Sequence, residues 1–218
     1  MTKIITSLGT PTLIGADING EAAGDNFGES VSFSSDGSRI AIGAYRNGGN
    51  GSNSGHVRIY DYNGSAWAQV GQDIDGEAGG DYSGKSISLS SDGSRVAIGA
   101  YENGGNGAKS GHVRIYDYNG SAWAQLGQDI DGEAAEDRSG YSVSISSDGS
   151  RVAIGAYSAN GSDSGHVRIY DYNGSAWVQV GADIDGEAAD DASGLSISLS
   201  SDGSRVAIGA PSNDGNGN

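Results

Sequence analysis

The stretch Ser-Asp-Gly-Ser-Arg-(Val/Ile)-Ala-Ile-Gly-Ala occurs four times in this chain of 218 residues, and most of the surrounding sequence repeats with it. Its glycine falls at Gly37, Gly93, Gly149 and Gly203, so successive copies lie 56, 56 and 54 residues apart. A fixed period of this length predicts one supersecondary unit copied in tandem. A feature present in every copy builds the unit, so the places where the copies disagree are better candidates for ligand contact. We expect one domain over residues 1–218, with repeats at about 24–79, 80–135, 136–189 and 190–218 after an N-terminal segment 1–23.

Each copy is expected to form four short antiparallel strands. In the second copy, runs that alternate polar with apolar residues or are rich in β-branched ones lie at 86–90, 95–100, 112–118 and 121–127. Asp92-Gly93 and Asn119-Gly120 are the dipeptides of type I′ hairpin turns, which need a positive φ at both central residues. No segment shows a helical period. The sequence therefore predicts an all-β fold, a β-propeller of four-stranded antiparallel blades with four blades per chain.

The N-terminal strands are expected to complete the last blade. Residues 15–21 align with 71–77, which places residues 3–5 and 12–14 where the third and fourth strands of a blade belong, with Pro11 in the position of Trp67. The last copy carries only the first two strands. Two strands from each end would then form the fourth blade and leave no open sheet edge. Alternatively, four blades cover half a turn and a two-fold homodimer closes an eight-bladed ring, so monomer and homodimer both stay open.

A family resemblance follows from the lead-in to the first hairpin. Gly24-Asp25-Asn26-Phe27-Gly28 precedes that hairpin, and a tryptophan closes each of the first three copies, at Trp67, Trp123 and Trp177. Together these motifs resemble the bacterial FG-GAP repeat over essentially the whole chain, although later copies replace the Phe by Ser83, Ser139 and Ser193. The resemblance implies a propeller like the head of integrin α subunits, used for extracellular recognition.

Calcium is the cofactor to consider. In the integrin version of the repeat, calcium lies in a long acidic loop between strands one and two, but here that loop is only Ser34–Ser38 and lacks the required carboxylates. The acidic segment between blades is the remaining candidate, because oxygens at alternate positions around a glycine resemble a calcium loop. The alternative is that these side chains cap turns. The copies are Asp17/Asn19/Glu21/Asp25, Asp73/Asp75/Glu77/Asp81, Asp129/Asp131/Glu133/Asp137 and Asp183/Asp185/Glu187/Asp191.

Aromatic residues repeat in every full copy and could stack on a glycan. The candidate ligand-binding residues are Trp67, Trp123, Trp177, Tyr62, Tyr118 and Tyr172. Packing between adjacent blades is the competing interpretation, because every propeller needs such contacts in each repeat. Likewise, His56, His112 and His166 begin the third strands, where they could bind a metal but are better explained by structural hydrogen bonding.

Composition narrows the class of partner. The formal charge of −16 disfavours nucleic acid and anionic membranes, and no apolar run is long enough for a transmembrane helix. The absence of cysteine excludes disulfides and thiolate catalysis, and no single-copy catalytic set is present, so we expect no enzyme. The expected function is recognition or adhesion through a protein or glycan ligand, outside a cell or on a virion, without a visible Sec signal peptide. The alternative is a structural spacer or decoration module in a surface assembly.

Overall fold

The computed structural model describes residues 2–6 and 12–215, and nearly all of its regular structure is antiparallel β-sheet. Within these residues the only helix is one π-helical turn, η1 (Ala159–Asp163). Pro11, whose place in the repeat the sequence analysis noted, lies outside the described residues. The all-β prediction is confirmed.

Three complete sheets follow one another along the chain. The first contains β3 (Ser30–Phe33), β4 (Arg39–Ala44), β5 (His56–Tyr62), β6 (Trp67–Gln69) and β7 (Ile74–Asp75). The second contains β8 (Ser86–Leu89), β9 (Arg95–Ala100), β10 (His112–Tyr118), β11 (Trp123–Gln125) and β12 (Ile130–Asp131). The third contains β13 (Ser142–Ile145), β14 (Arg151–Ala156), β15 (His166–Tyr172), β16 (Trp177–Gln179) and β17 (Ile184–Asp185).

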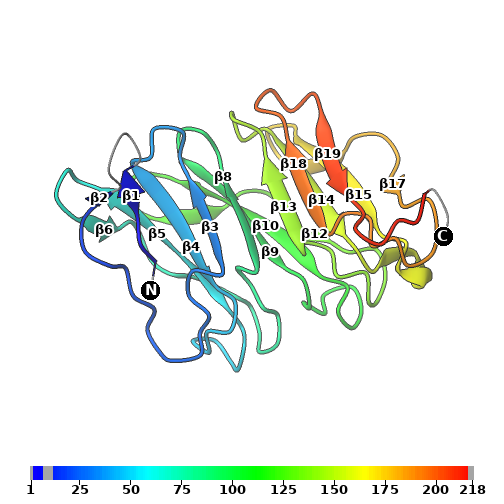
Figure 1. Ribbon diagram of the computed structural model, residues 1–218, viewed down its shortest axis with the longest axis horizontal. Helices are drawn as coiled ribbons and strands as arrows, with labels where there is room; N and C mark the ends of the chain where they lie inside the picture. Colours follow the sequence, from blue (N-terminus) through cyan, green and yellow to red (C-terminus); the bar gives the residue numbers. More distant parts are fainter. Residues whose placement is uncertain (1, 7–11, 216–218) are drawn as a thin grey trace.

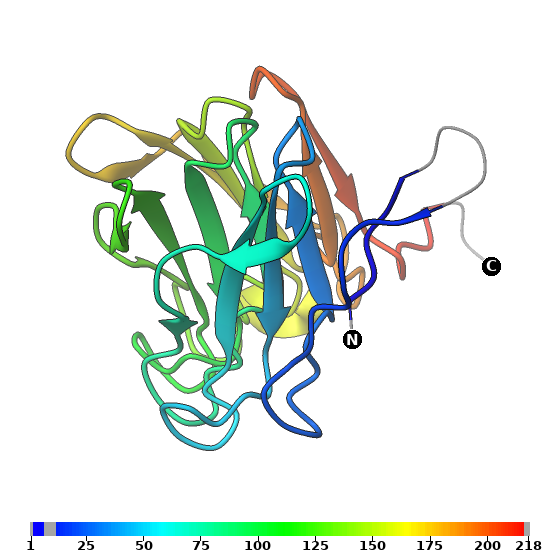
Figure 2. The ribbon, with the colours of Figure 1, turned by 90° about the vertical axis from the view of Figure 1, so that its left-hand side faces the viewer.

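Each complete sheet is one four-stranded antiparallel blade with a short fifth strand. Four strands pair in chain order, and the fifth pairs with the third beyond the end of the fourth. The strands of the second copy therefore match the predicted ones. Figure 1 shows the sheets side by side along the long axis, with the N-terminus and C-terminus at opposite ends, and Figure 2 shows them from the N-terminal side.

The turn inside each first hairpin differs from the predicted type I′. Gly93 has φ +69°, but Asp92 does not have a positive φ. Instead the Asp92 carboxylate accepts hydrogen bonds from the Ser90 hydroxyl (2.7 Å) and from the backbone N–H of Ser94 (2.9 Å). Because the Asp side chain closes the turn itself, only the glycine needs the left-handed conformation.

The apolar core lies between blades. In the second blade, Ile87 and Ile98 pack against Val57 and Ile59 of the first. The small residues of the second strands allow this close approach: a Cβ added to Gly99 would lie 2.0 Å from the carbonyl oxygen of Gly140 in the next repeat. A blade therefore has little core of its own, and its stability depends on its neighbours.

Two half-blades flank the complete ones. At one end, β1 (Ile5–Thr6) pairs with β2 (Thr12–Leu13), and at the other end β18 (Ser196–Leu199) pairs with β19 (Val206–Gly209). The alignment of the N-terminal pair with strands three and four is confirmed, because Ile5 pairs with Leu13 as Tyr60 pairs with Gln69.

The predicted completion of the fourth blade within one chain is not what the structure shows. Among the described residues, β1–β2 and β18–β19 form separate two-stranded sheets. Ile4 and Ile18 pack on Ile40 and Ile42 of the first blade, so the N-terminal pair is held three blades away from β19. A closed ring would require the same packing on the first blade, so the separation means that the three blades do not curve far enough to bring the two half-blades together.

Candidate functional site

The residues that vary most among the copies lie at one end of the blades. Strand two ends and strand three begins there, since Ala44 pairs with His56, and strand one also begins there, since Ser30 pairs with Gly43. At this end, two positions of the lead-in to strand one carry a different residue in each of the four copies. They are occupied by Asn26, Tyr82, Arg138 and Ala192, and by Glu29, Lys85, Tyr141 and Leu195. The first set shares a φ of 55–56°, so one backbone turn presents four different side chains.

Five tyrosines form a continuous row at this end, which we call the tyrosine row. Tyr45, Tyr101 and Tyr157 follow the second strands, and Tyr82 and Tyr141 lie between them in the lead-in turns. Ring centroids along the row are 5.8 Å apart for the first pair, then 5.5, 5.4 and 4.5 Å. Tyr45 is buried and the other four are partly exposed. Contacts of this length hold the rings in place.

Cationic side chains lie over the same rings. The Lys85 ammonium is 5.0 Å from the Tyr45 ring centroid and 5.7 Å from that of Tyr141, and it pairs with Glu29 at 2.9 Å. The Arg138 guanidinium carbon is 5.6 Å from the Tyr157 centroid, and this Arg also donates to the Tyr157 hydroxyl. Together with burial, the Glu102 carboxylate and the neighbouring rings raise the pKa of Tyr101 to about 12. The Tyr101 hydroxyl is therefore neutral at physiological pH.

The predicted tryptophans lie between blades. Trp123 and Trp177 are each 3% exposed, and each indole N–H donates at 2.9 Å to a backbone carbonyl of the preceding blade. Trp67 is half-buried and donates to Ile14 at 3.1 Å. The predicted tyrosines pack on these indoles at 5.1–5.2 Å and are half-buried: Tyr62, Tyr118 and Tyr172. The tryptophans thus form the inter-blade packing that competes with glycan binding as an interpretation, whereas each tyrosine packs on the tryptophan of its own blade.

The predicted calcium residues of one acidic segment do not gather in one place. Asp81 is buried and accepts from the Ala78 N–H at 2.9 Å and the Asn103 amide at 3.1 Å, which is a turn-capping role. Asp25, Asp137 and Asp191 accept the equivalent backbone N–H. Of the rest, Asp73 and Asp75 face His56 of their own blade, whereas Glu77 faces His112 of the next.

Each segment therefore contributes to two different clusters. Three groups of one Glu, one His and one Asp have ligand atoms within 4.8 Å of one another: Glu21/His56/Asp73, Glu77/His112/Asp129 and Glu133/His166/Asp183. Sequence reasoning treated the histidines and the carboxylates separately and so missed these clusters. The equal spacing of both series along the repeat was the available signal.

The tyrosine row was also missed. Its signal in the sequence was that Tyr101 and Tyr157 occupy the position of Pro211 in the fourth copy. Only the packing of neighbouring repeats shows that Tyr82 and Tyr141 fill the gaps between them.

These observations define a tandem-repeat protein of propeller-type blades. The family model of the FG-GAP repeat matches residues 19–60, from the segment before β3 to the middle of β5, and so confirms the resemblance to that repeat. The same strand pattern recurs in the following copies, and FG-GAP repeats are typical of non-catalytic modules in extracellular or surface proteins. No curated protein matches the chain significantly. Within the described residues, no helix has the length and apolarity needed to cross a membrane.

Proposed function

We propose that this chain is a non-catalytic β-propeller-type recognition module, acting outside a cell or on a virion surface, whose tyrosine row contacts a protein or glycan ligand. The observation that carries the proposal is the position of the variable residues. Two positions that carry a different residue in all four copies lie beside one row of rings, and several of their side chains either belong to the row or pack on it. A surface that varies on a constant scaffold is the arrangement expected of a binding site.

The chemistry of the row suits an uncharged or cationic ligand. Tyrosine supplies a large rigid contact area with a polar tip, which stacks on sugar faces and on apolar protein side chains. The net charge of −16 repels polyanions.

A glycan array run in calcium and again in EGTA tests the proposal and the predicted calcium residues together. We expect reproducible binding that Tyr101→Ala and Tyr141→Ala each abolish or weaken at least about tenfold, the loss of roughly 1.4 kcal/mol of contact energy. Val178→Ala is the control, because Val178 is exposed on β16 and pairs with Asp171 at the end of the blade opposite the row. Trp67→Ala tests the tryptophan prediction separately.

Two outcomes would contradict the recognition proposal. One is the absence of binding to any sugar on the array, together with the absence of binding in a screen of immobilised surface proteins. The other is binding that survives both tyrosine substitutions while the variants remain folded.

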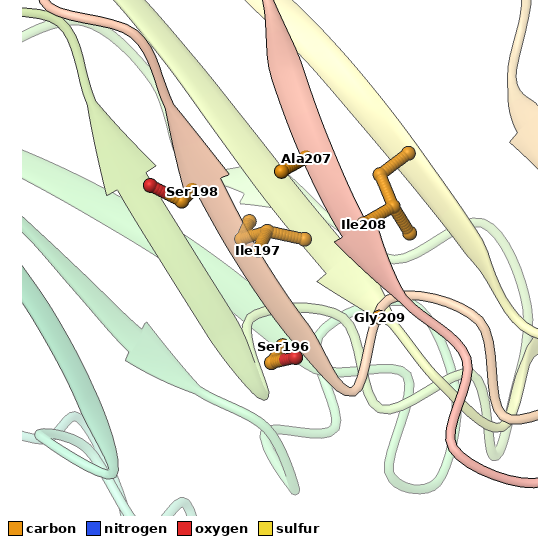
Figure 3. Close-up of a pocket in the computed structure, with 6 residues that line it drawn as sticks. All are labelled: Ser196, Ile197, Ser198, Ala207, Ile208 and Gly209. Atoms are coloured by element: carbon orange, nitrogen blue, oxygen red, sulfur yellow. The ribbon is translucent and has the colours of Figure 1, made fainter.

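A second candidate, a module that assembles with copies of itself, is favoured by the two half-blades. β18–β19 has the first two strands of a blade, and β1–β2 has the last two. The six residues of β18 and β19 in Figure 3 line an open hollow of about 320 Å³. At the other end, Val31 and Phe33 of β3 are 51% and 44% exposed, although their counterparts Ile87 and Leu89 are buried. We propose that one copy's β1–β2 completes the partner's β18–β19, which also covers Val31 and Phe33.

The repeat specifies the register of this contact. Thr2 bridges Ile18 as Val57 pairs with Ile74, so Ile4 is equivalent to Ile59, which pairs with Ala41. Ile4 of one copy is therefore expected opposite Ala207 of the other. Since the chain has no cysteine, the double variant Ile4→Cys/Ala207→Cys reports this pairing directly.

Oxidation of that variant is expected to give a covalent dimer, and light scattering of the unmodified chain a mass of about 44 kDa, twice the 21.9 kDa of one chain. Ala207→Cys alone is the control for random oxidation. A disulfide within a single chain would instead support the four-bladed monomer, and a 21.9 kDa particle would contradict assembly.

A further inference from the structure

Each Glu–His–Asp cluster is built from three successive segments in the same way. In the second cluster the histidine begins β10, the aspartate precedes β12, and the glutamate comes from the preceding acidic segment. His112 is 1% exposed, with Nδ1 3.7 Å from Asp129 and 3.9 Å from Glu77. His56 lies at the same 3.7 and 3.9 Å from Asp73 and Glu21, and His166 lies 3.9 Å from Asp183.

The buried imidazoles lack a hydrogen-bond partner. Nδ1 of both His112 and His166 is enclosed by protein atoms and forms no hydrogen bond. The separations of 3.7–3.9 Å are too long for a hydrogen bond. They are close to the spacing of two ligands of one ion, since atoms each about 2.1 Å from a tetrahedral ion lie about 3.4 Å apart.

The carboxylates are held in position by second partners. Gln125 donates to Oδ1 of Asp129 at 2.6 Å, which leaves Oδ2 directed toward His112. Gln69 and Gln179 hold Oδ1 of Asp73 and of Asp183 at 2.6 and 2.7 Å, and Oδ2 of Asp73 also accepts from Arg58 at 3.2 Å. Such outer partners orient the ligands of metal sites.

An arginine pairs with the first carboxylate oxygen, Oε1, of each glutamate. Arg114 lies 3.4 Å from Oε1 of Glu77, whereas Oε2 faces His112. Arg58 and Arg168 likewise pair with Oε1 of Glu21 and of Glu133, and Oε2 of Glu21, which faces His56, also accepts from the Asn47 amide at 3.1 Å. In the first cluster Asp75 also approaches His56, at 4.0 Å, so three carboxylates and one guanidinium leave two negative charges, which one divalent cation would neutralise.

We propose that these three clusters are sites for a divalent transition-metal ion such as Zn²⁺, bound by one imidazole nitrogen and two carboxylate oxygens. Calcium prefers a shell of oxygens, whereas a buried imidazole with carboxylates suits zinc. Because each site joins two acidic segments across a third strand, the ion links consecutive blades. This inference is independent of the recognition proposal.

Chelator-treated protein titrated with ZnCl₂, followed by native mass spectrometry and calorimetry, tests the sites. We expect up to three Zn²⁺ per chain, one for each cluster, and a raised melting temperature, because the ion binds only the folded state. Glu133→Gln is expected to remove one ion. The Glu133 side chain is 54% exposed, so the substitution does not disturb a core.

Glu187→Gln is the matched control. Glu187 is the fourth copy of the same glutamate, and among the described residues it faces no histidine of a following blade. The proposal is overturned if no Zn²⁺ binds, if Glu133→Gln and Glu187→Gln retain the same stoichiometry, or if CaCl₂ binds at these positions in preference to ZnCl₂.

Discussion

The second blade and the half-blade β18–β19 have almost the same sequence in their first two strands but different environments. Ile98 is 2% exposed in the second blade, and its counterpart Ile208 is partly exposed. The difference arises because β9 pairs with β10 on the edge away from β8, whereas β19 has no third strand beside it among the described residues. The position of a strand in the stack of blades, more than the identity of its residues, therefore sets how much apolar surface it buries.

The largest expected effect of this difference is on core truncation. Ile98→Ala should lower the free energy of unfolding by about 2–5 kcal/mol, because it opens a cavity between two blades. Ile208→Ala should cost less than half as much, since that side chain already contacts solvent. Urea unfolding of both variants measures the comparison, and equal losses would mean that β19 is covered in solution.

The close approach between blades gives the next effect. A Cβ at Gly99 would lie 2.0 Å from a backbone carbonyl and 2.4 Å from the Ser86 hydroxyl, whereas at Gly209 the closest atom is the rotatable Ser196 hydroxyl at 2.3 Å. Gly99→Ala should therefore destabilise the fold by about 1–3 kcal/mol. Gly209→Ala should have a clearly smaller effect in the same thermal unfolding experiment. A larger loss at Gly209 would contradict the comparison.

The repeated arginine is expected to stabilise the second blade more than the half-blade. Arg95 donates two hydrogen bonds to Asp117, at 2.5 and 2.9 Å, and a third to the Gly149 carbonyl at 2.8 Å. Its counterpart Arg205 is exposed on the half-blade. Arg95→Ala should cost about 1–2 kcal/mol, and Arg205→Ala less than about 0.5 kcal/mol. Chemical denaturation measures the loss of stability in both variants. Equal losses would show that the hydrogen bonds between Arg95 and Asp117 do not stabilise the fold.

The smallest difference between a complete blade, here the third, and the half-blade is expected in their response to acid. The Ser146 hydroxyl and the Ser150 N–H lower the pKa of Asp148 to about 2, and Ser200 and Ser204 do the same for Asp202. Each carboxylate stabilises the fold above its unfolded pKa of about 3.9, and this stability is lost as the pH falls toward 2. Asp148→Asn and Asp202→Asn should both flatten the decline of the urea midpoint between pH 4 and 2. Unequal slopes would show that the position of a blade in the stack affects the stability of its turn.

Much of the fold could be predicted from the repeat. The strands of each copy followed from alternation and from turn dipeptides. The turn type was wrong because the side chain of Asp92 closes the turn, a contact that a dipeptide pattern does not distinguish from a backbone conformation.

Less of the candidate sites could be predicted. Glu77 lies two residues after Asp75 in the sequence, yet it faces His112 across the boundary between blades. Tyr82 and Tyr141 belong to different copies and occupy different positions of the repeat, but they contact the same ring, that of Tyr101. Both groupings depend on how one repeat stacks on the next.

The sequence by itself determined the blade: its strands, its hairpins and the resemblance to the FG-GAP repeat are local, because they depend on alternation and turn chemistry within one copy. Only the tertiary structure decided where the N-terminal strands pack, which residues form the tyrosine row and which carboxylates face each histidine. Those features arise between copies, where the burial of apolar faces fixes the stacking of blades and brings together residues that the repeat places far apart.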